Sequence, residues 1–180
     1  RRGYELGTGL EFRRVLVRSG DGALLIVANE FLDALPVRQL IRTGQGWRER
    51  MVGLDGGRLV PVAGTQPMDA AVPPARADAP VGAIIETSPA AAATLYEASG
   101  RLAAQGGAAL FIDYGFCEPR FGPSLPAVPA LRMVDALSAP GHADLSAPVD
   151  FFALAPIAIA RGARWLGTAE QGPTLGAPGV

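Results

Sequence analysis

The sequence predicts an α/β protein in which parallel strands form a sheet that is covered on both faces. Two short apolar runs, 23–28 and 108–112, each end at a polar turn that carries an acidic side chain. An Ala-rich segment of helical length lies between them along the chain and is bounded by Ser88 and Gly106. Wholly apolar strands that alternate with helices are typical of parallel sheets.

Length and charge narrow the class of protein. The 180 residues predict a single domain over 1–180. The net charge of −1 is spread without a basic stripe, which argues against nucleic acid as the main partner. No apolar run approaches the ~20 residues of a membrane span, and the start at Arg1 lacks the apolar stretch of a signal peptide. We therefore expect a cytoplasmic protein.

The first half of the chain continues from strand 23–28 into a polar turn. A short helix or turn is expected around 35–41. The segments 47–52 and 58–62 flank a Gly-rich connection that begins at Asp55, which predicts a β-hairpin. Pro61 has no N–H to donate and would place the second strand of this hairpin at a sheet edge.

The second half begins with 64–80, which is dense in Pro, Ala and Asp and is expected to be a surface loop inside the domain. Order returns at 83–87. Ser88 as N-cap and Pro89 in the first helical position predict a helix that runs to about Gln105. After strand 108–112 we expect three further features: a loop-like stretch to Pro129, a helix over 149–161 kinked or split at Pro156, and a short strand at 163–168.

Acidic turns follow both apolar strands, where α/β sheets bind their ligands. Glu30 and Asp33 could converge on one ligand to hold a guanidinium, to hold a ribose hydroxyl pair, or to act as acid and base. Alternatively, Asn29 caps the next turn while the two acids interact with its dipole. Asp113 and Tyr114 allow the same two interpretations, because Asp before Gly often simply ends a strand.

The single histidine and the single cysteine carry little chemistry. His142 follows a Pro-Gly turn without a metal-ligating partner at helical spacing, so a solvated loop histidine is expected. Cys117 has only Arg120 as a basic neighbour, which does not predict a reactive thiolate. One Cys and one His exclude an internal disulfide and a Cys/His zinc site, and we expect no metal.

Five motifs together resemble one family, the MidA-like methyltransferases, to which the mitochondrial complex I assembly factor with arginine methyltransferase activity belongs. The resemblance extends from about Leu24 to Gln171. The motifs occur in the family's order and approximate spacing: ANEFLDALPVRQ, GWRERMV, ETSPAAAA, GGAALFIDYG and PGHADLSAPVDF.

The resemblance implies a Rossmann-like class I S-adenosylmethionine-dependent methyltransferase fold, incomplete in its N-terminal half and with a β-hairpin insertion. It implies S-adenosylmethionine as cofactor and places 24–28 at the family's fourth strand, so that the next turn lies beside the transferred methyl. Catalytic residues would be Glu30 and Asp33, clamping an arginine guanidinium. Substrate-binding residues would be Asn29, Phe31, Asp113 and Tyr114, and cofactor-binding residues Asn29 and Glu30, with Gly7 and Gly9 only if Glu5–Gly9 is a remnant of the family's glycine loop.

Three positions depart from the family pattern. Phe116, Leu131 and Pro148 stand at or near places where histidine is usual. The resemblance therefore leaves two functions open. The first is arginine methyl transfer to a protein substrate, expected to be a subunit of respiratory complex I. The second is a non-catalytic interaction or assembly module.

Two further expectations come from the residues. An unrelated hydrolase or reductase is the weakest interpretation, because the sequence has no G-x-S-x-G elbow and no complete G-x-G-x-x-G after a strand. An incomplete sheet would leave an edge or an apolar face uncovered, so we expect self-association as a homo-oligomer.

Overall fold

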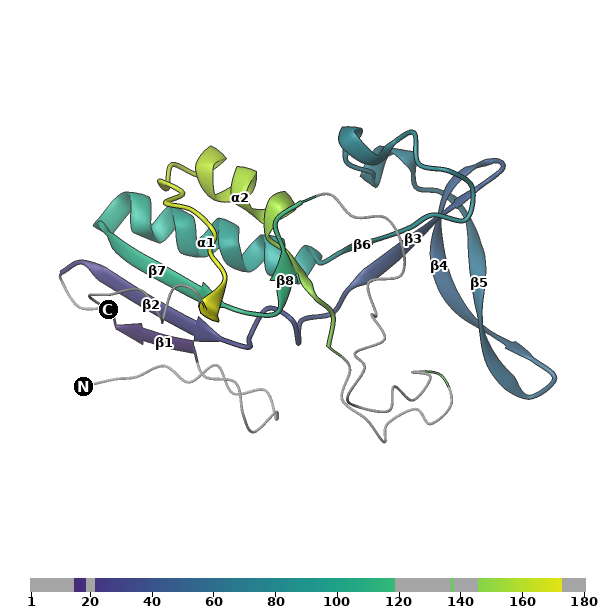
Figure 1. The fold of residues 1–180 in the computed structure, drawn as a ribbon, viewed down its shortest axis with the longest axis horizontal. Coiled ribbons are helices and arrows are strands. Elements are labelled where there is room, and N and C mark those ends of the chain that lie inside the picture. Colours follow the sequence, from purple (N-terminus) through teal and green to yellow (C-terminus); the bar gives the residue numbers. More distant parts are fainter. Residues whose placement is uncertain (1–14, 19–21, 119–136, 138–145, 173–180) are drawn as a thin grey trace. The chain divides into compact units, whose positions relative to one another are not determined.

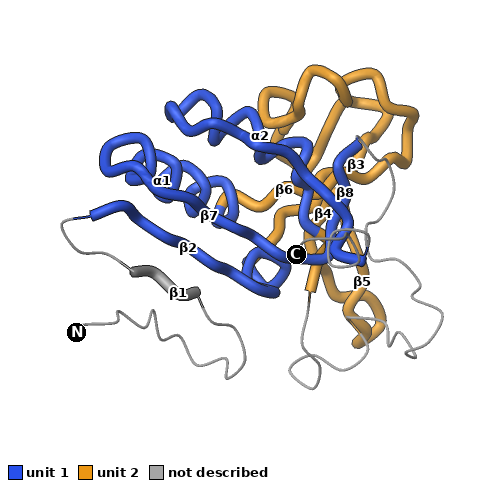
Figure 2. Tube along the Cα trace, turned by 60° about the vertical axis from the view of Figure 1, so that its left-hand side comes forward, with its two compact units in different colours: residues 1–35, 90–118, 149–180 blue, residues 36–89, 119–148 orange. Residues whose placement is uncertain are grey.

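The computed structural model describes residues 15–18, 22–118, 137 and 146–172, and it has the predicted α/β class. The chain forms two compact units, distinguished by colour in Figure 2. Unit 1 combines residues 1–35, 90–118 and 149–180, and unit 2 combines residues 36–89 and 119–148. Gly7, Gly9, Leu131 and His142 lie outside the described residues.

Unit 1 is built on a three-stranded sheet in the order β1-β2-β7 (Figure 1). Strand β2 (Leu24–Asn29) pairs in parallel with β7 (Gly107–Ile112), which confirms the two predicted strands and their parallel arrangement. Strand β1 (Val15–Arg18) pairs with the other edge of β2 in the antiparallel direction, so the sheet is mixed.

Helix α1 (Pro89–Gln105) connects unit 2 to β7 and covers one face of the sheet. Its buried positions recur at helical spacing and are Ala91, Leu95, Ala98 and Ser99. Ala98 packs against Leu24 and Ile26 of β2. The helix ends as predicted at Gly106, whose φ of +73° suits glycine and whose N–H donates to the Leu102 carbonyl at 2.8 Å.

Among the described residues, one face of the sheet lacks the cover that the sequence predicts. Leu25 is 54% exposed, Val27 45% and Leu110 56%. Successive side chains of a strand point to opposite faces. Leu24 and Ile26 therefore face α1, whereas these three apolar side chains, which we name the open face, point away from it.

Helix α2 (Phe151–Ala160) also belongs to unit 1. It follows a short parallel pair of strands, β8 (Gly115–Phe116) and β9 (Val149–Asp150). The Asp150 side chain caps the helix by accepting the Ala153 N–H at 2.9 Å. The predicted helix is confirmed over these ten residues, and it continues through Pro156 as one element.

The strand predicted at 163–168 does not form. Gly162 and Gly167 adopt φ of +93° and +141°, values outside the extended region, and no strand of the described chain pairs with this segment. Arg161, just before it, instead joins the two helices. Its guanidinium lies 4.5 Å from the centre of the Tyr96 ring on α1.

Unit 2 contains a four-stranded antiparallel sheet in the order β5-β4-β3-β6. The predicted hairpin is confirmed by β4 (Gly46–Asp55) and β5 (Arg58–Pro67). Its turn places Gly56 and Gly57 at φ of +53° and +81°, which explains why two glycines stand there. Pro61 lies on β5, the edge strand, as predicted.

Two expectations for unit 2 were wrong at their boundaries. Instead of the helix or turn expected around 35–41, residues Arg38–Thr43 form strand β3. Strand β3 pairs with both β4 and β6 (Ile84–Thr87), and this pairing determines its structure more than the local sequence does. The predicted loop over 64–80 begins as strand β5.

The remainder of that segment folds over the core of unit 2. It contains two 3₁₀ turns, η1 (Asp69–Ala71) and η2 (Pro74–Arg76). Val72 and Ala79 from this segment pack on the buried side chains of Leu40, Trp47 and Ile85. The Trp47 indole N–H donates to the Ala77 carbonyl at 3.3 Å, which holds the segment against the sheet.

The two ends of the segment between β2 and α1 lie close together. The Ser88 hydroxyl donates to the Pro36 carbonyl at 3.0 Å. Ser88 and Pro89 stand immediately before and at the start of α1, as predicted.

We predict that Gly107→Ala strongly destabilises the fold. Gly107 has a φ of +125°, and a Cβ there would lie 1.9 Å from the Leu24 carbonyl oxygen. The substitution should lower the free energy of unfolding by at least about 3 kcal/mol, since backbone strain and a clash between paired strands act together. Urea denaturation measures the loss.

Gly22→Ala is the matched control, because a Cβ at Gly22 meets nothing within 4 Å. It should change the free energy of unfolding by no more than about 0.5 kcal/mol. Equal effects of the two substitutions would contradict the close approach of β2 and β7.

Candidate active site

The candidate site lies where the two parallel strands of unit 1 end at the same edge. Asn29 is in register with Ile112 at these carboxyl ends. The Glu30 N–H continues the ladder by donating to the Ile112 carbonyl at 2.8 Å. The turn that begins at Asn29 and the turn that begins at Asp113 therefore lie side by side, as the sequence predicts.

The turn after β2 is held by a carboxylate from β7's end. Asp113 Oδ2 accepts the Phe31 N–H at 3.1 Å and the Leu32 N–H at 2.8 Å. The Leu35 N–H closes the turn on the Leu32 carbonyl at 3.1 Å. Glu30 has a φ of +47° and is the one non-glycine residue of the described chain with positive φ.

Two carboxyl groups meet behind this turn. Asp33 is 7% exposed, and its side chain lies beside that of Asp113. The pKa of Asp113 is raised from 3.8 to about 6, mainly because the carboxyl is buried. The hydrogen bonds from the Leu32 and Phe31 amides lower this pKa, whereas the negative charge of Asp33 and the hydrogen bond between the two carboxyl groups raise it further. Asp113 Oδ1 is buried and has no hydrogen-bond partner among the described residues.

The remaining predicted site residues lie around the turn. The Asn29 and Glu30 side chains are exposed, whereas Phe31 packs against the cluster that contains Leu32 and Leu95. Tyr114 is 71% exposed, and its carbonyl accepts the Val149 N–H at 2.7 Å. Glu30 is thus the carboxylate that the site presents to solvent.

The exposed groups fit a cationic ligand. A carboxylate at Glu30 suits a guanidinium, a sulfonium or an ammonium group, and the Asn29 amide can both donate and accept. S-adenosylmethionine carries such cationic groups together with ribose hydroxyls. Among the described residues, no group of three or more His, Cys, Asp or Glu side chains could hold a metal ion.

Sequence reasoning missed a second polar cluster, which lies in unit 2. Gln39 donates from its side chain to Glu86 Oε1 and accepts from Arg50. Burial raises the pKa of Glu86, while the Gln39 hydrogen bond and the Arg50 charge oppose it. The signal that could have revealed this cluster is a carboxylate, Glu86, near the end of the apolar run 83–87.

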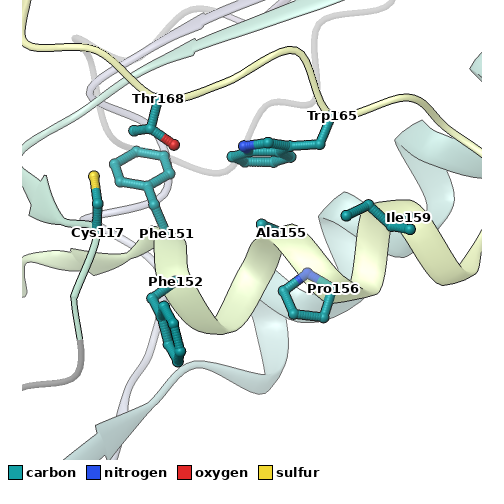
Figure 3. A pocket seen from close by; sticks show the side chains of 8 residues that line it. All are labelled: Cys117, Phe151, Phe152, Ala155, Pro156, Ile159, Trp165 and Thr168. Atoms are coloured by element: carbon teal, nitrogen blue, oxygen red, sulfur yellow. The ribbon is translucent and has the colours of Figure 1, made fainter.

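An apolar hollow of about 280 Å³ lies beside α2 (Figure 3). The Trp165 indole lies over Ala155, and Cys117 and Thr168 supply the polar side chains at its margin. Because none of the described residues that line it is charged, this hollow does not offer the chemistry of the strand-end site.

The fold and the paired strand ends are those of the Rossmann-like class, whose members bind ligands at the carboxyl edge of the sheet. Comparison with protein families makes this specific. Residues 13–169 match a family described as "Putative S-adenosyl-L-methionine-dependent methyltransferase". The chain belongs to this family, which confirms the resemblance and the fold expected from it.

Curated relatives support the same assignment. The "protein arginine methyltransferase NDUFAF7, mitochondrial" of Rattus norvegicus is 35% identical over 170 residues, which are 92% of this chain and 38% of the relative. The protein of that name in Xenopus tropicalis is 36% identical over 133 residues, or 72% of this chain and 30% of the relative. The chain therefore spans about a third of the length of these relatives.

Solved structures agree. A Burkholderia thailandensis member of the COG1565 superfamily, described as a likely methyl transferase bound to S-adenosyl-homocysteine, is similar with a TM-score of 0.56 and 29% identity. The similarity covers 78% of this chain and 38% of that one. An uncharacterised protein of the same superfamily and organism has a TM-score of 0.56 and 26% identity over 81% of this chain and 41% of its own.

The expectation of a cytoplasmic protein is wrong, because relatives in frog, rat and human carry the word mitochondrial in their names. That expectation rested on the first residues of a chain that matches about a third of its relatives' length, and such residues carry no information on targeting. Separately, no helix among the described residues is long and apolar enough to cross a membrane.

We predict that Asp113 makes stability depend on pH. Its pKa is about 6 in the folded protein and 3.8 ordinarily, so the folded state binds more protons than the unfolded state between these values. The free energy of unfolding should therefore contain a contribution that is present below about pH 4 and is lost as the pH rises through about 6. Urea denaturation from pH 4 to 8 measures it.

Asp113→Asn isolates this contribution from other titrating groups, among them Glu86. The difference in unfolding free energy between the wild type and the variant should change with pH across this range and become constant above it. A difference that is independent of pH would contradict the raised pKa of Asp113.

Proposed function

We propose that this chain carries the acceptor side of an S-adenosylmethionine-dependent methyltransferase site that modifies arginine in a protein. The observation that carries the proposal is the Glu30 carboxylate, exposed at the carboxyl end of two parallel strands. Family membership and the names of the arginine methyltransferase relatives support it.

For methyl transfer, the protein must align the methyl donor and the guanidinium more than it must activate them. S-adenosylmethionine supplies a methyl group already activated by its sulfonium. Glu30 would hold the guanidinium by charge-assisted hydrogen bonds and accept the proton that the attacking nitrogen loses. Asn29 would orient the same group or the cofactor, and Phe31 and Tyr114 would border the acceptor.

Three further predicted residues remain proposals. Gly7 and Gly9 would contact the cofactor if Glu5–Gly9 belongs to a glycine-rich loop. Asp33 is buried beside Asp113. It would contribute to a guanidinium clamp through its charge on the buried side of the turn and not through an exposed side chain.

The acceptor would be a protein, as the names of the relatives suggest, and we propose a subunit of respiratory complex I or its bacterial counterpart. A mitochondrial location would suit this substrate.

The second candidate is a non-catalytic interaction or assembly module. The open face of Leu25, Val27 and Leu110 favours it, because exposed apolar patches commonly mark protein contacts. The two candidates differ in whether the chain supports methyl transfer.

We predict that Glu30→Gln lowers kcat/KM for methylation of an arginine peptide by about 100-fold, because it removes the charge that holds the guanidinium. The glutamate side chain is exposed, so the unfolding free energy should change little. Transfer of radioactive methyl from S-adenosylmethionine measures the effect, with calorimetry for cofactor binding.

The matched control is Glu97→Gln on α1, where an exposed glutamate pairs with Arg101 at 2.8 Å. It should leave the rate unchanged. Methylation by the wild type that survives Glu30→Gln would remove Glu30 from the site. Absence of both methylation and S-adenosylmethionine binding in the wild type would favour the assembly module.

We also predict that the chain self-associates through the open face. Replacing Val27 by Thr and Leu110 by Ser together should weaken association about tenfold, since this corresponds to about 1.4 kcal/mol of lost apolar contact. Sedimentation velocity measures the change. Val81→Ser, at a 71% exposed valine of unit 2, is the control and should have no effect.

A monomeric wild type at high concentration would contradict this prediction. So would equal weakening by the Val81 control, which would indicate nonspecific association.

A further inference from the structure

The backbone of Glu30 needs an explanation. Side chains other than glycine rarely adopt a φ of +47°, and they do so where surrounding structure imposes it. The residue is also the exposed carboxylate of the proposed site. Whatever holds its backbone therefore sets the direction in which that carboxylate leaves the sheet.

The next two residues show what holds it. The Phe31 and Leu32 N–H groups both donate to Asp113 Oδ2, at 3.1 and 2.8 Å. These bonds connect residues that are 82 and 81 positions apart in the chain. Together with the Glu30 N–H on Ile112, three successive amides after β2 are fixed by the end of β7.

Asp33 completes the arrangement from inside. It is buried beside Asp113, whose Oδ1 has no hydrogen-bond partner among the described residues. Two carboxyl groups this close are most stable when they share one proton. A carboxyl that is buried in this way is poorly placed to bind a guanidinium from solvent.

We propose that Asp113 is a positioning residue that orients Glu30 through the Phe31 and Leu32 amides, and that Asp33 is its proton-sharing partner. This inference rests on the proposed function for its catalytic meaning. It replaces the expectation that Asp113 contacts substrate and that Asp33 forms the second arm of a guanidinium clamp.

Few charged groups among the described residues lie near the carboxyl groups of Asp33 and Asp113. Asp33, from the turn after β2, is the titratable group whose charge bears on Asp113. Asp150 of the neighbouring β9 accepts the Ala153 N–H at the start of α2, and the Glu30 side chain is exposed. The raised pKa of Asp113 agrees with a pair that retains a proton below about pH 6.

The first test follows the two clamped amides by NMR hydrogen exchange in the full chain. Asp113→Ala removes the acceptor, so exchange at Phe31 and Leu32 should accelerate at least about tenfold. Asp113→Asn keeps an acceptor oxygen, and exchange should stay within about threefold of the wild type. Unchanged exchange at both amides in Asp113→Ala would overturn the proposal.

Asp150→Ala is the matched control, since it removes another aspartate that accepts a backbone amide. It should accelerate exchange at Ala153 and leave Phe31 and Leu32 unchanged. If Asp150→Ala accelerated hydrogen exchange at Phe31 and Leu32 as much as Asp113→Ala does, the effect would reflect a general loss of stability. That result would contradict a specific role of Asp113 in holding these two amides.

The second test reads the shared proton and needs no destabilising variant. In the wild type, the Phe31 and Leu32 amide signals should titrate with a midpoint near 6, the pKa of Asp113. Asp113→Asn should abolish this titration, and Asp33→Asn should lower its midpoint by removing the neighbouring charge. A wild type without the titration, or an unchanged midpoint in Asp33→Asn, would overturn the proton-sharing pair.

Enzyme kinetics then separate this inference from the proposed function. Asp113→Ala should lower kcat on the order of tenfold or more through misalignment, whereas Asp113→Asn should retain most of it. If the wild type shows no methyl transfer while both NMR results are as expected, the proposed function is wrong, but the role of Asp113 in holding the Phe31 and Leu32 amides is still supported. If methyl transfer is present and insensitive to Asp113→Ala, the positioning of Glu30 is refuted.

Discussion

The parallel pairing of β2 with β7 is the interaction on which the rest of unit 1 depends. Its register places Asn29 opposite Ile112, so both strands end at one level. Asp113 can reach the Phe31 and Leu32 amides only in this register, because a shift of one residue would turn its side chain to the other face. Helix α1 enforces the pairing by packing on Leu24 and Ile26 from one side.

The best predicted elements are those with strong local signals. The apolar runs of β2 and β7, the Ser-Pro start and Gly-Gly end of α1, and the Gly56-Gly57 turn each carry their own explanation in a few residues. Strand β3 does not, because Arg38–Thr43 becomes a strand only by pairing with two partners distant in sequence. Coverage of the sheet was also beyond local reasoning, since Leu25 and Leu24 are equally apolar and only packing distinguishes them.

In the candidate site too, some features carry a local sequence signal and others depend on contacts between residues that are distant in the chain. The sequence predicts a site at the two strand ends, because general rules of α/β sheets apply there. Sequence spacing paired Glu30 with Asp33, whereas the structure places Asp33 beside Asp113. Contact between side chains eighty residues apart leaves no periodic signal. The left-handed backbone of Glu30 likewise follows from hydrogen bonds that the turn residues alone do not reveal.

The short distance between Pro36 and Ser88 has a consequence for how such a protein can evolve. These residues begin and close the excursion that builds the sheet of unit 2, and one hydrogen bond joins them. Because the excursion leaves and returns at almost the same point, residues can be added or removed within it without changing the separation of β2 from α1. The hairpin is thus free to diversify while the strand ends of the candidate site keep their spacing.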